Sequence, residues 1–355
     1  MRKESLEFLR ELIEAPSPSG YEQPAARVVR RWMEPVADEV RTDVHGNTIC
    51  VLNPRGKIRI MLSGHCDQIG FMVKYITDEG YIYFAAIGGF DENLIAGHRV
   101  VIHTASGPVP GVVGKKPIHL MEAEERKKTT EIKQLWIDIG AKNRKEAEKV
   151  VSIGDPVTFD LALTHLRNDR IVATGFDDKM GTFVVMEAMR LLTKQKSRLQ
   201  AAVYSVATVQ EEIGLRGAKT SAWGIDPHVG IACDVDFASD YPTIEKTLVG
   251  DVRLGRGPVI ARGANINPMV YELLTRAAKA GKIPYQVSGA PRATGTDANF
   301  IQLTRAGVAA GLVSVPNRYM HTTVEVISTA DLENAAKLLA AFILKVTPRT
   351  DFIPR

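Results

Sequence analysis

The chain has 355 residues, of which 45% are hydrophobic and 24% are charged, and its formal net charge is +4. These values are typical of soluble globular proteins. Acidic and basic residues are interleaved, which argues against nucleic-acid binding, and no apolar run approaches the roughly 18 residues of a membrane span. The charged N-terminus is unlike a secretory signal. We therefore expect a cytoplasmic protein. Its length suggests about two domains, because a domain typically has roughly 150 residues.

The first part of the chain predicts helices followed by strands. Apolar residues at helical spacing predict a helix over residues 1–15, and a second helix over 22–33 follows a loop rich in Pro, Ser and Gly. Strand-like runs come next, the last of them over 58–65. After Gly70 the pattern changes to short strands paired as hairpins, which predicts a small β-rich domain, a barrel or a sandwich.

The C-terminal half predicts a different architecture. A strand over residues 170–175 leads to a long helix over 179–192, and strands then alternate with helices to the end. Such alternation implies a mostly parallel sheet with helices on both faces. The predicted fold class is α/β with an inserted β-rich domain, in which residues 1–70 and 167–355 form the larger domain and 71–166 the insert.

Five possible metal ligands are scattered along the chain, and nearly all follow apolar strand-like runs: His65, Asp177, Glu212, Asp234 and His321. An open α/β sheet places its chemistry at the carboxyl ends of its strands, so we expect these side chains to converge. Mixed imidazole and carboxylate ligands suit Zn²⁺ or Co²⁺, with Mn²⁺ also possible. A pair of such ions can activate a shared water, so the pattern predicts a dinuclear hydrolase.

The adjacent acids Glu211 and Glu212 are the most informative pair. They follow a strand that is apolar enough to be buried on both faces. Two carboxylates there are costly unless they are solvated, paired or bound to a metal. Neighbouring side chains diverge, so one can bind a metal while the other serves as a general base.

Each candidate also has a plain structural interpretation. A histidine at a strand end or in a loop is often only hydrogen bonded or exposed, and Asp177 and Asp178 open a helix, where acids favour the first turn. Cys66 and Cys233 are interpreted as small buried residues. Asp236 would share the strand face of the ligand two residues before it if that strand continues.

These residues resemble the TET (tetrahedral) aminopeptidases, dinuclear metallopeptidases related to glutamyl and leucyl aminopeptidases and to so-called cellulase-M proteins. The resemblance covers essentially the whole chain. It is carried by the segments SGHCDQIGFMV, FDDK, ATVQEEIGLRGAKTSAWGI, GTDA and SVPNRYMHTTVEV. It implies a phosphorylase/hydrolase-like domain interrupted by a β-barrel-like dimerisation domain.

The resemblance assigns the metal ligands. His65 and Asp234 match the ligands of one metal ion. Glu212 and His321 match those of a second ion, and Asp177 matches the carboxylate that bridges the two.

The resemblance also assigns catalytic and substrate-binding residues. Glu211 matches the general base that activates the water between the metals, and Asp67 matches the residue that supports the first histidine ligand. Thr296 and Asp297 match a substrate-pocket segment, with helix capping as the alternative. His119 could reach a neighbouring subunit's site, although the family more often has two prolines before that histidine.

The sequence therefore predicts a metal-dependent aminopeptidase that acts on peptides. Family members typically form dodecamers built from dimers with sites facing an inner chamber, which implies a homo-oligomer without nucleic-acid or membrane partners. Two alternatives stay open: a glycosidase, whose paired carboxyls lie about 5–9.5 Å apart, and a non-catalytic scaffold on the same fold. The preferred N-terminal residue does not follow from the sequence.

Overall fold

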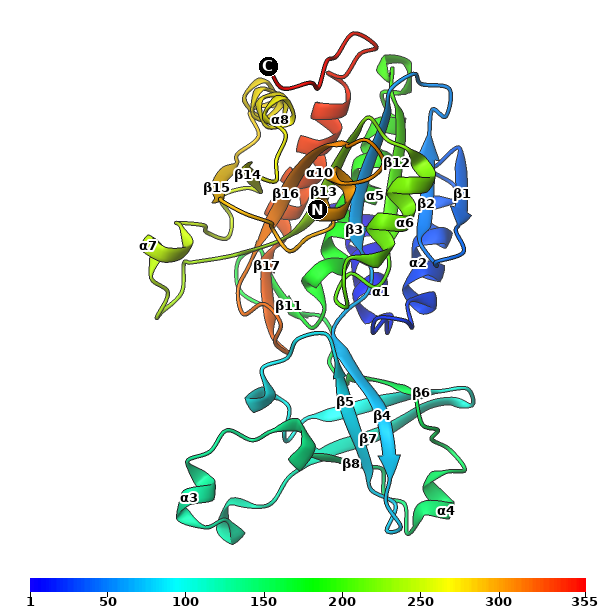
Figure 1. The fold of residues 1–355 in the computed structure, drawn as a ribbon, viewed down its shortest axis with the longest axis vertical. Helices are drawn as coiled ribbons and strands as arrows, with labels where there is room; N and C mark the ends of the chain where they lie inside the picture. Colours follow the sequence, from blue (N-terminus) through cyan, green and yellow to red (C-terminus); the bar gives the residue numbers. More distant parts are fainter.

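The computed structural model describes residues 1–355, with a larger α/β part joined to a smaller β-barrel (Figure 1). The larger part contains an eight-stranded sheet. In spatial order its strands are Glu39–Thr42 (β1), Thr48–Leu52 (β2), Ala202–Thr208 (β12), Arg59–His65 (β3), Val229–Phe237 (β13), Ala309–Asn317 (β16), Val259–Gly263 (β14) and Gln286–Ala290 (β15).

The centre of this sheet is parallel. Strands β12, β3, β13 and β16 are neighbours and all run in the same direction. Antiparallel pairs join this centre to β2 on one side and to β14 on the other. The expected fold class, a mostly parallel sheet with an inserted β-rich domain, is confirmed.

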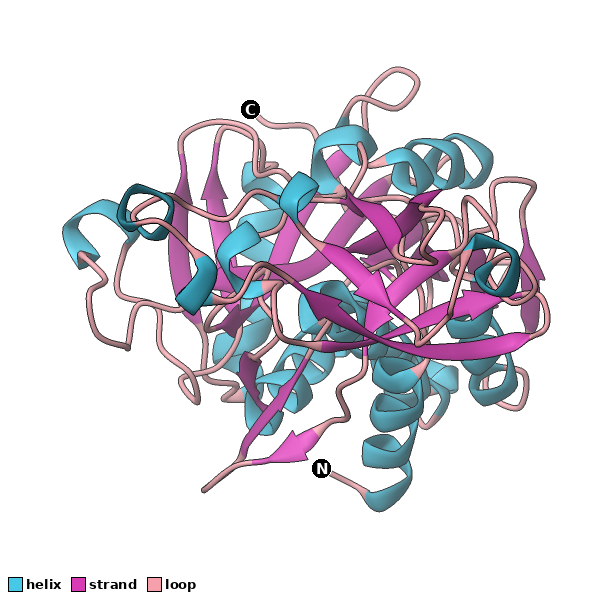
Figure 2. Ribbon diagram, turned by 90° about the horizontal axis from the view of Figure 1, so that it is seen from below, coloured by secondary structure: helices cyan, strands magenta, loops and turns pink.

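Helices cover both faces of the sheet (Figure 2). They are α1 (Lys3–Glu14), α2 (Gln23–Met33), α5 (Phe176–Thr193), α6 (Arg216–Ile225), α8 (Pro268–Gly281), α9 (Ala298–Gln302) and α10 (Thr329–Ile343). The short helix α7 (Lys246–Val249) is exposed and lies away from the sheet (Figure 1). None of the helices combines the length and the apolar character needed to span a membrane.

Side-chain alternation along the strands explains the two layers of core. In β3, Ile60 and Leu62 pack into the large cluster that includes α1, α5 and α10. Met61 points to the other face and packs with residues of α6 and α9. A strand covered on both faces needs apolar residues at successive positions, which is why these strands read as continuous apolar runs.

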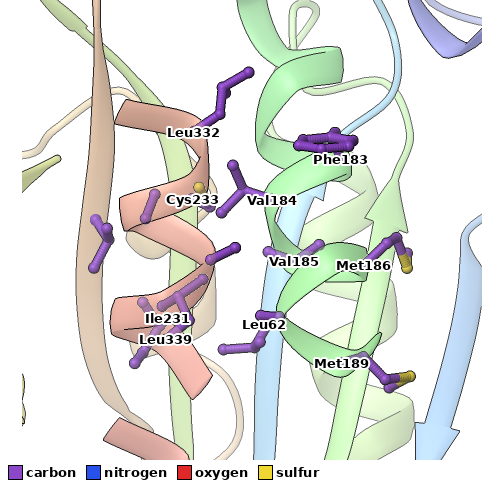
Figure 3. Packing of buried hydrophobic residues seen from close by; sticks show 14 of the residues in the cluster. Leu62, Phe183, Val184, Val185, Met186, Met189, Ile231, Cys233, Leu332 and Leu339 are labelled. Atoms are coloured by element: carbon purple, nitrogen blue, oxygen red, sulfur yellow. The ribbon is translucent and has the colours of Figure 1, made fainter. Parts of the chain in front are cut away.

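Helix α5 is the most buried helix of the molecule. Val184 and Val185 belong to the same apolar cluster as Leu62 of β3 and Cys233 of β13 (Figure 3). Cys233 is a free buried thiol, as is Cys66, and both are therefore small core residues as expected. The helix range begins at Phe176, but Asp177 and Asp178 have non-helical backbone angles, so the regular helix starts at Lys179, as the sequence predicted.

The start of α5 lies unusually close to β3. A Cβ atom added at Gly64 would lie 2.3 Å from backbone atoms of Gly181 and Thr182. A Cβ added at Gly181 would lie 2.3 Å from the Asp178 carboxylate. Only glycine permits this approach, which brings the first turn of the helix to the end of β3.

The smaller part is a closed barrel in the order β4-β5-β8-β7-β6-β9. Its strands are Gly70–Ile76 (β4), Ile82–Ile87 (β5), Arg99–Thr104 (β6), Gly107–Gly114 (β7), Trp136–Asp138 (β8) and Pro156–Phe159 (β9). Phe71 organises its core, with ring centroids 4.6 Å from Phe90, 5.0 Å from Phe84 and 5.3 Å from Phe159. The segment between β7 and β8, which contains α3 (Ala123–Arg126), projects from the barrel (Figure 1).

The strand expected over residues 170–175 lies outside the large sheet. It forms β11 (Arg170–Ala173), which pairs antiparallel with β10 (Thr164–His165) and β17 (Glu325–Ser328) in a separate three-stranded sheet. Its alternate residues are only half buried, unlike those of the central strands. It therefore serves as a short connection from the barrel to α5.

The close approach of β3 and α5 leads to a stability prediction. Gly64→Ala should lower the free energy of unfolding by at least about 1–3 kcal/mol, because the new methyl group meets backbone that cannot rotate away. Gly224→Ala is the matched control, since a Cβ there meets nothing within 4 Å in an exposed part of α6. That change should be neutral or stabilise by up to about 1 kcal/mol. Thermal unfolding of both variants measures the difference, and equal midpoints would contradict the packing argument.

Candidate metal centre

The four central strands bring their carboxyl ends together, as the sequence predicted. His65 is the last residue of β3. Glu211 and Glu212 follow β12, and His321 follows β16. Asp234 lies within β13, which continues to the end of its range at residue 237 rather than stopping at the aspartate.

Asp177 enters the same region from the first turn of α5 and lies between the two histidines. Its Oδ1 atom is 3.2 Å from Nε2 of His65, and its Oδ2 atom is 3.1 Å from Nε2 of His321. One carboxylate thus directs each oxygen towards a different imidazole. This is the arrangement expected of a carboxylate that bridges two metal ions.

The other ring nitrogen of each histidine already faces an acceptor. Nδ1 of His65 is 3.0 Å from the carbonyl oxygen of Asp67, and Nδ1 of His321 is 3.1 Å from the carbonyl oxygen of Gly89. If each Nδ1 donates its proton there, each Nε2 keeps a lone pair directed at the centre. Gly89 lies between β5 and β6, so a segment of the barrel part helps to orient a histidine of the larger part.

The remaining expected ligands complete the cluster. The potential ligand atoms of His65, Asp177 and Glu212 all lie within 4.8 Å of one another, and the same holds for His65, Asp178 and Asp234. Oε2 of Glu212 is 3.7 Å from Nε2 of His321, whereas its Oε1 is buried without a hydrogen-bond partner. The structure therefore brings all five expected ligands together.

The electrostatics of this cluster demand positive charge. Burial, reinforced by neighbouring carboxylates, raises the pKa of Glu211 to about 10 and those of Glu212 and Asp234 to about 8. For Asp177 burial acts in the same direction, but the hydrogen bonds with His321 and His65 outweigh it and lower its pKa. The hydrogen bond with Asp177 in turn raises the pKa of His321 to about 9.

No lysine or arginine neutralises these carboxylates. Their only ion-pair partners are histidines. The amine of the nearby buried Lys179 points away, 3.0 Å from the carbonyl oxygen of Ile13 and 2.6 Å from that of Ala15. Clustered buried carboxylates with an unpartnered oxygen and two oriented imidazoles fit a pair of divalent cations.

Asp67 holds several parts of the site in place. It is fully buried, and its carboxylate accepts hydrogen bonds from the Ser19 hydroxyl at 2.6 Å and from the backbone N–H groups of Glu211 and Glu212 at 3.0 and 3.2 Å. Its Oδ1 atom is also 3.4 Å from Nδ1 of His65. Asp67 thus supports the first histidine chiefly through its carbonyl oxygen and holds the two adjacent glutamates through its carboxylate.

A cavity of about 540 Å³ opens at the cluster, and the five expected ligands and Glu211 all line it. Thr296, expected to bind substrate, lines it as well. Asp297 lies behind the wall, where Oδ2 accepts a hydrogen bond from the Thr208 hydroxyl at 2.7 Å. His119 is exposed on the segment between β7 and β8 and does not line the cavity.

Comparison with known proteins agrees with this geometry. The family model for M42 glutamyl aminopeptidase matches residues 46–338. The chain belongs to this family. Its resemblance to the TET aminopeptidases is thereby confirmed, and aminopeptidase is the activity named for the family and for several relatives.

Three relatives illustrate the match. The lysyl aminopeptidase of Pyrococcus furiosus is 38% identical over 98% of this chain and 99% of its own. A TET aminopeptidase from a marine-sediment thaumarchaeon has a TM-score of 0.93 at 36% identity, with 97% of each chain covered. The Pyrococcus horikoshii TET1 peptidase has a TM-score of 0.86 at 31% identity over 96% of this chain and 100% of that one.

Two further acids of this M42 chain take part in the site: Asp178, which the sequence marked only as one of two acids at a helix start, and Glu325, which the sequence did not mark. Asp178 accepts the backbone N–H of Gly181 at 3.1 Å and that of His65 at 3.0 Å, so it is the capping member of the Asp177–Asp178 pair. Glu325 is buried at the start of β17 and accepts the N–H groups of Asp177 at 3.2 Å and His321 at 3.1 Å. The only signal for Glu325 in the sequence was an isolated acid between two valines.

Glu325 should therefore control metal binding without touching the metal. In Glu325→Gln one carboxylate oxygen becomes an amide N–H₂ that faces a backbone N–H, which displaces Asp177 or His321. We expect the affinity for Zn²⁺ or Co²⁺ to fall about 10- to 100-fold. Metal titration of the chelated protein measures this. The control is Glu272→Gln, at an exposed residue of α8 that pairs with Arg276. Equal metal affinities in the two variants would contradict the positioning role of Glu325.

Proposed function

We propose that this chain is a dinuclear metallo-aminopeptidase that removes residues from the N-termini of peptides. The observation that carries the proposal is the position of Asp177, whose two oxygens each face one histidine in a cavity that Glu211 also lines. The family match supports the reaction class, and the donor set supports the metals.

The proposed ligands divide into two groups around Asp177. His65 and Asp234 would hold one ion, and Glu212 and His321 would hold the other. When bound, two ions such as Zn²⁺ or Co²⁺ supply Lewis acidity to the scissile carbonyl and lower the pKa of water. A glycosidase is the weaker candidate, because in this proposal the acids of the cluster would serve as metal ligands and supports rather than as an acid pair across a glycosidic bond.

Glu211 is the proposed proton carrier. Its side chain is 8% exposed and lines the cavity, and its Oε2 atom lies 3.7 Å from Nε2 of His65. It would take a proton from the attacking water and deliver it to the leaving amine. Its backbone N–H is held by Asp67, so the support of the histidine and the placement of the base depend on the same residue.

We also propose that the chain forms a homo-oligomer. The Pyrococcus horikoshii relative can assemble into a tetrahedron or a large octahedral shell. On this chain the segment between β7 and β8 exposes Ile118 by 58% and Leu120 by 68%. Exposed apolar side chains on a projecting segment suit a contact between barrels of neighbouring copies, as in a dodecamer built from dimers.

Metal dependence is tested by removing and restoring the ions. Chelated protein should not hydrolyse aminoacyl-p-nitroanilides, and Zn²⁺, Co²⁺ or Mn²⁺ should restore activity on free amines but not on N-acetylated substrates. Restored metal at about 1,000 times its Kd should also add about 4 kcal/mol of stability. Full activity in the chelated protein would contradict the metal mechanism, and cleavage of N-acetylated substrates would contradict an aminopeptidase.

The role of Glu211 is tested separately. Glu211→Gln should lower kcat about 10²- to 10⁴-fold, because the amide cannot accept the proton, while bound metal measured by elemental analysis stays the same. Glu272→Gln is again the surface control and should keep wild-type turnover. Near-normal kcat in the Glu211 variant with full metal content would show that another group carries the proton.

A further inference from the structure

The cavity contains one carboxylate that the proposed metal chemistry does not use. Apart from Glu211 and the proposed ligands, its only charged lining residue is Asp236. Neither lysine nor arginine lines the cavity, and no cation of the protein pairs with Asp236. The N-terminal residue named for this chain's relatives differs, glutamyl for the family and lysyl for the Pyrococcus furiosus member, so the residues of this cavity are the better guide.

The position of Asp236 follows from the length of β13. Because the strand continues to Phe237, Asp236 lies two residues beyond Asp234 on the same face. Two residues of strand separate positions by about 6.6 Å. The carboxylate therefore lies away from the metal centre, farther along the cavity wall, where the end of a long side chain would be.

Several residues of the cavity lining are apolar. Ala261, Leu312 and Met320 line the same cavity, together with the small polar residue Ser288. Lysine and arginine combine an apolar stem with a cationic end, and they bury the stem on apolar surface while the charge seeks a partner. The Asp236 carboxylate accepts a hydrogen bond from the backbone N–H of Phe237 at 2.8 Å but pairs with no cation of the protein. A cavity with apolar side chains in its lining and one such carboxylate matches that combination.

We propose that this cavity holds the side chain of the substrate's N-terminal residue, that Asp236 pairs with its cation, and that the enzyme therefore prefers N-terminal lysine or arginine. This inference rests on the proposed aminopeptidase function and adds its substrate class. An N-terminal glutamate is disfavoured, because its carboxylate would face Asp236 without a compensating lysine or arginine.

The competing role for Asp236 is to bind the α-ammonium group, which every free N-terminus carries. The two roles differ in what they predict. A partner of the α-ammonium supports all substrates equally, whereas a partner of the side chain supports only basic ones. Norleucine separates them, because it has the α-ammonium and an unbranched apolar stem like that of lysine but no side-chain charge.

The test compares kcat/KM for lysyl-, norleucyl-, Nε-acetyl-lysyl- and glutamyl-p-nitroanilide with the metal-loaded enzyme. The wild type should prefer lysine to norleucine, and glutamate should be the poorest of the four. In Asp236→Asn the lysine-to-norleucine ratio should fall about 10- to 100-fold, the range of a lost hydrogen bond to a charged group. Asp251→Asn, at a half-exposed surface aspartate paired with Arg253 and outside the cavity, should keep the wild-type ratio.

Several outcomes would overturn the inference. An unchanged ratio in Asp236→Asn, or an equal loss on lysine and norleucine, would remove the side-chain role. A wild-type enzyme that prefers glutamate would remove the substrate class while leaving the aminopeptidase intact. Absence of turnover on every substrate would overturn both proposals. If the Asn variant does not fold, the wild type decides, because equal turnover of lysine and Nε-acetyl-lysine excludes recognition of the cation.

Discussion

The crowding of buried carboxylates at the carboxyl ends of parallel strands is the constraint on which the rest of this structure depends. Such a group of acids is unfavourable unless cations neutralise it. The fold creates the crowding by two means: adjacent parallel strands that end side by side, and the close approach of Gly64 and Gly181, which inserts Asp177 between His65 and His321. Packing thereby sets the electrostatics, and in this account the electrostatics would create the affinity for metal.

A layer of hydrogen bonds around the cluster turns this affinity into a defined geometry. Asp67 holds one histidine and both glutamates, Glu325 holds the backbone of Asp177 and His321, and the carbonyl of Gly89 orients the second imidazole. Because Gly89 lies between two barrel strands, the inserted part is physically coupled to the site. A displacement of the barrel would therefore reach a proposed metal ligand directly.

Much of this site follows from the sequence, because parallel strands align their ends. An acid or histidine after each apolar run is enough to predict convergence of His65, Glu212 and His321, and two adjacent acids after a buried strand mark the proposed base. The other features of the site could not be predicted, because they depend on contacts between distant segments and on where a strand ends, which local sequence patterns do not encode. The support from Gly89 requires the barrel to fold back on the site, and the place of Asp236 in the cavity depends on how far β13 continues.

The central claim is that Asp177 bridges two divalent ions. The most direct measurement is anomalous X-ray diffraction from crystals grown with Zn²⁺ or Co²⁺, with data recorded on both sides of the metal's absorption edge. The account predicts two anomalous peaks in each chain, one beside His65 and Asp234 and one beside His321 and Glu212, with Asp177 between them. A single peak, or peaks that do not contact Asp177, would contradict it.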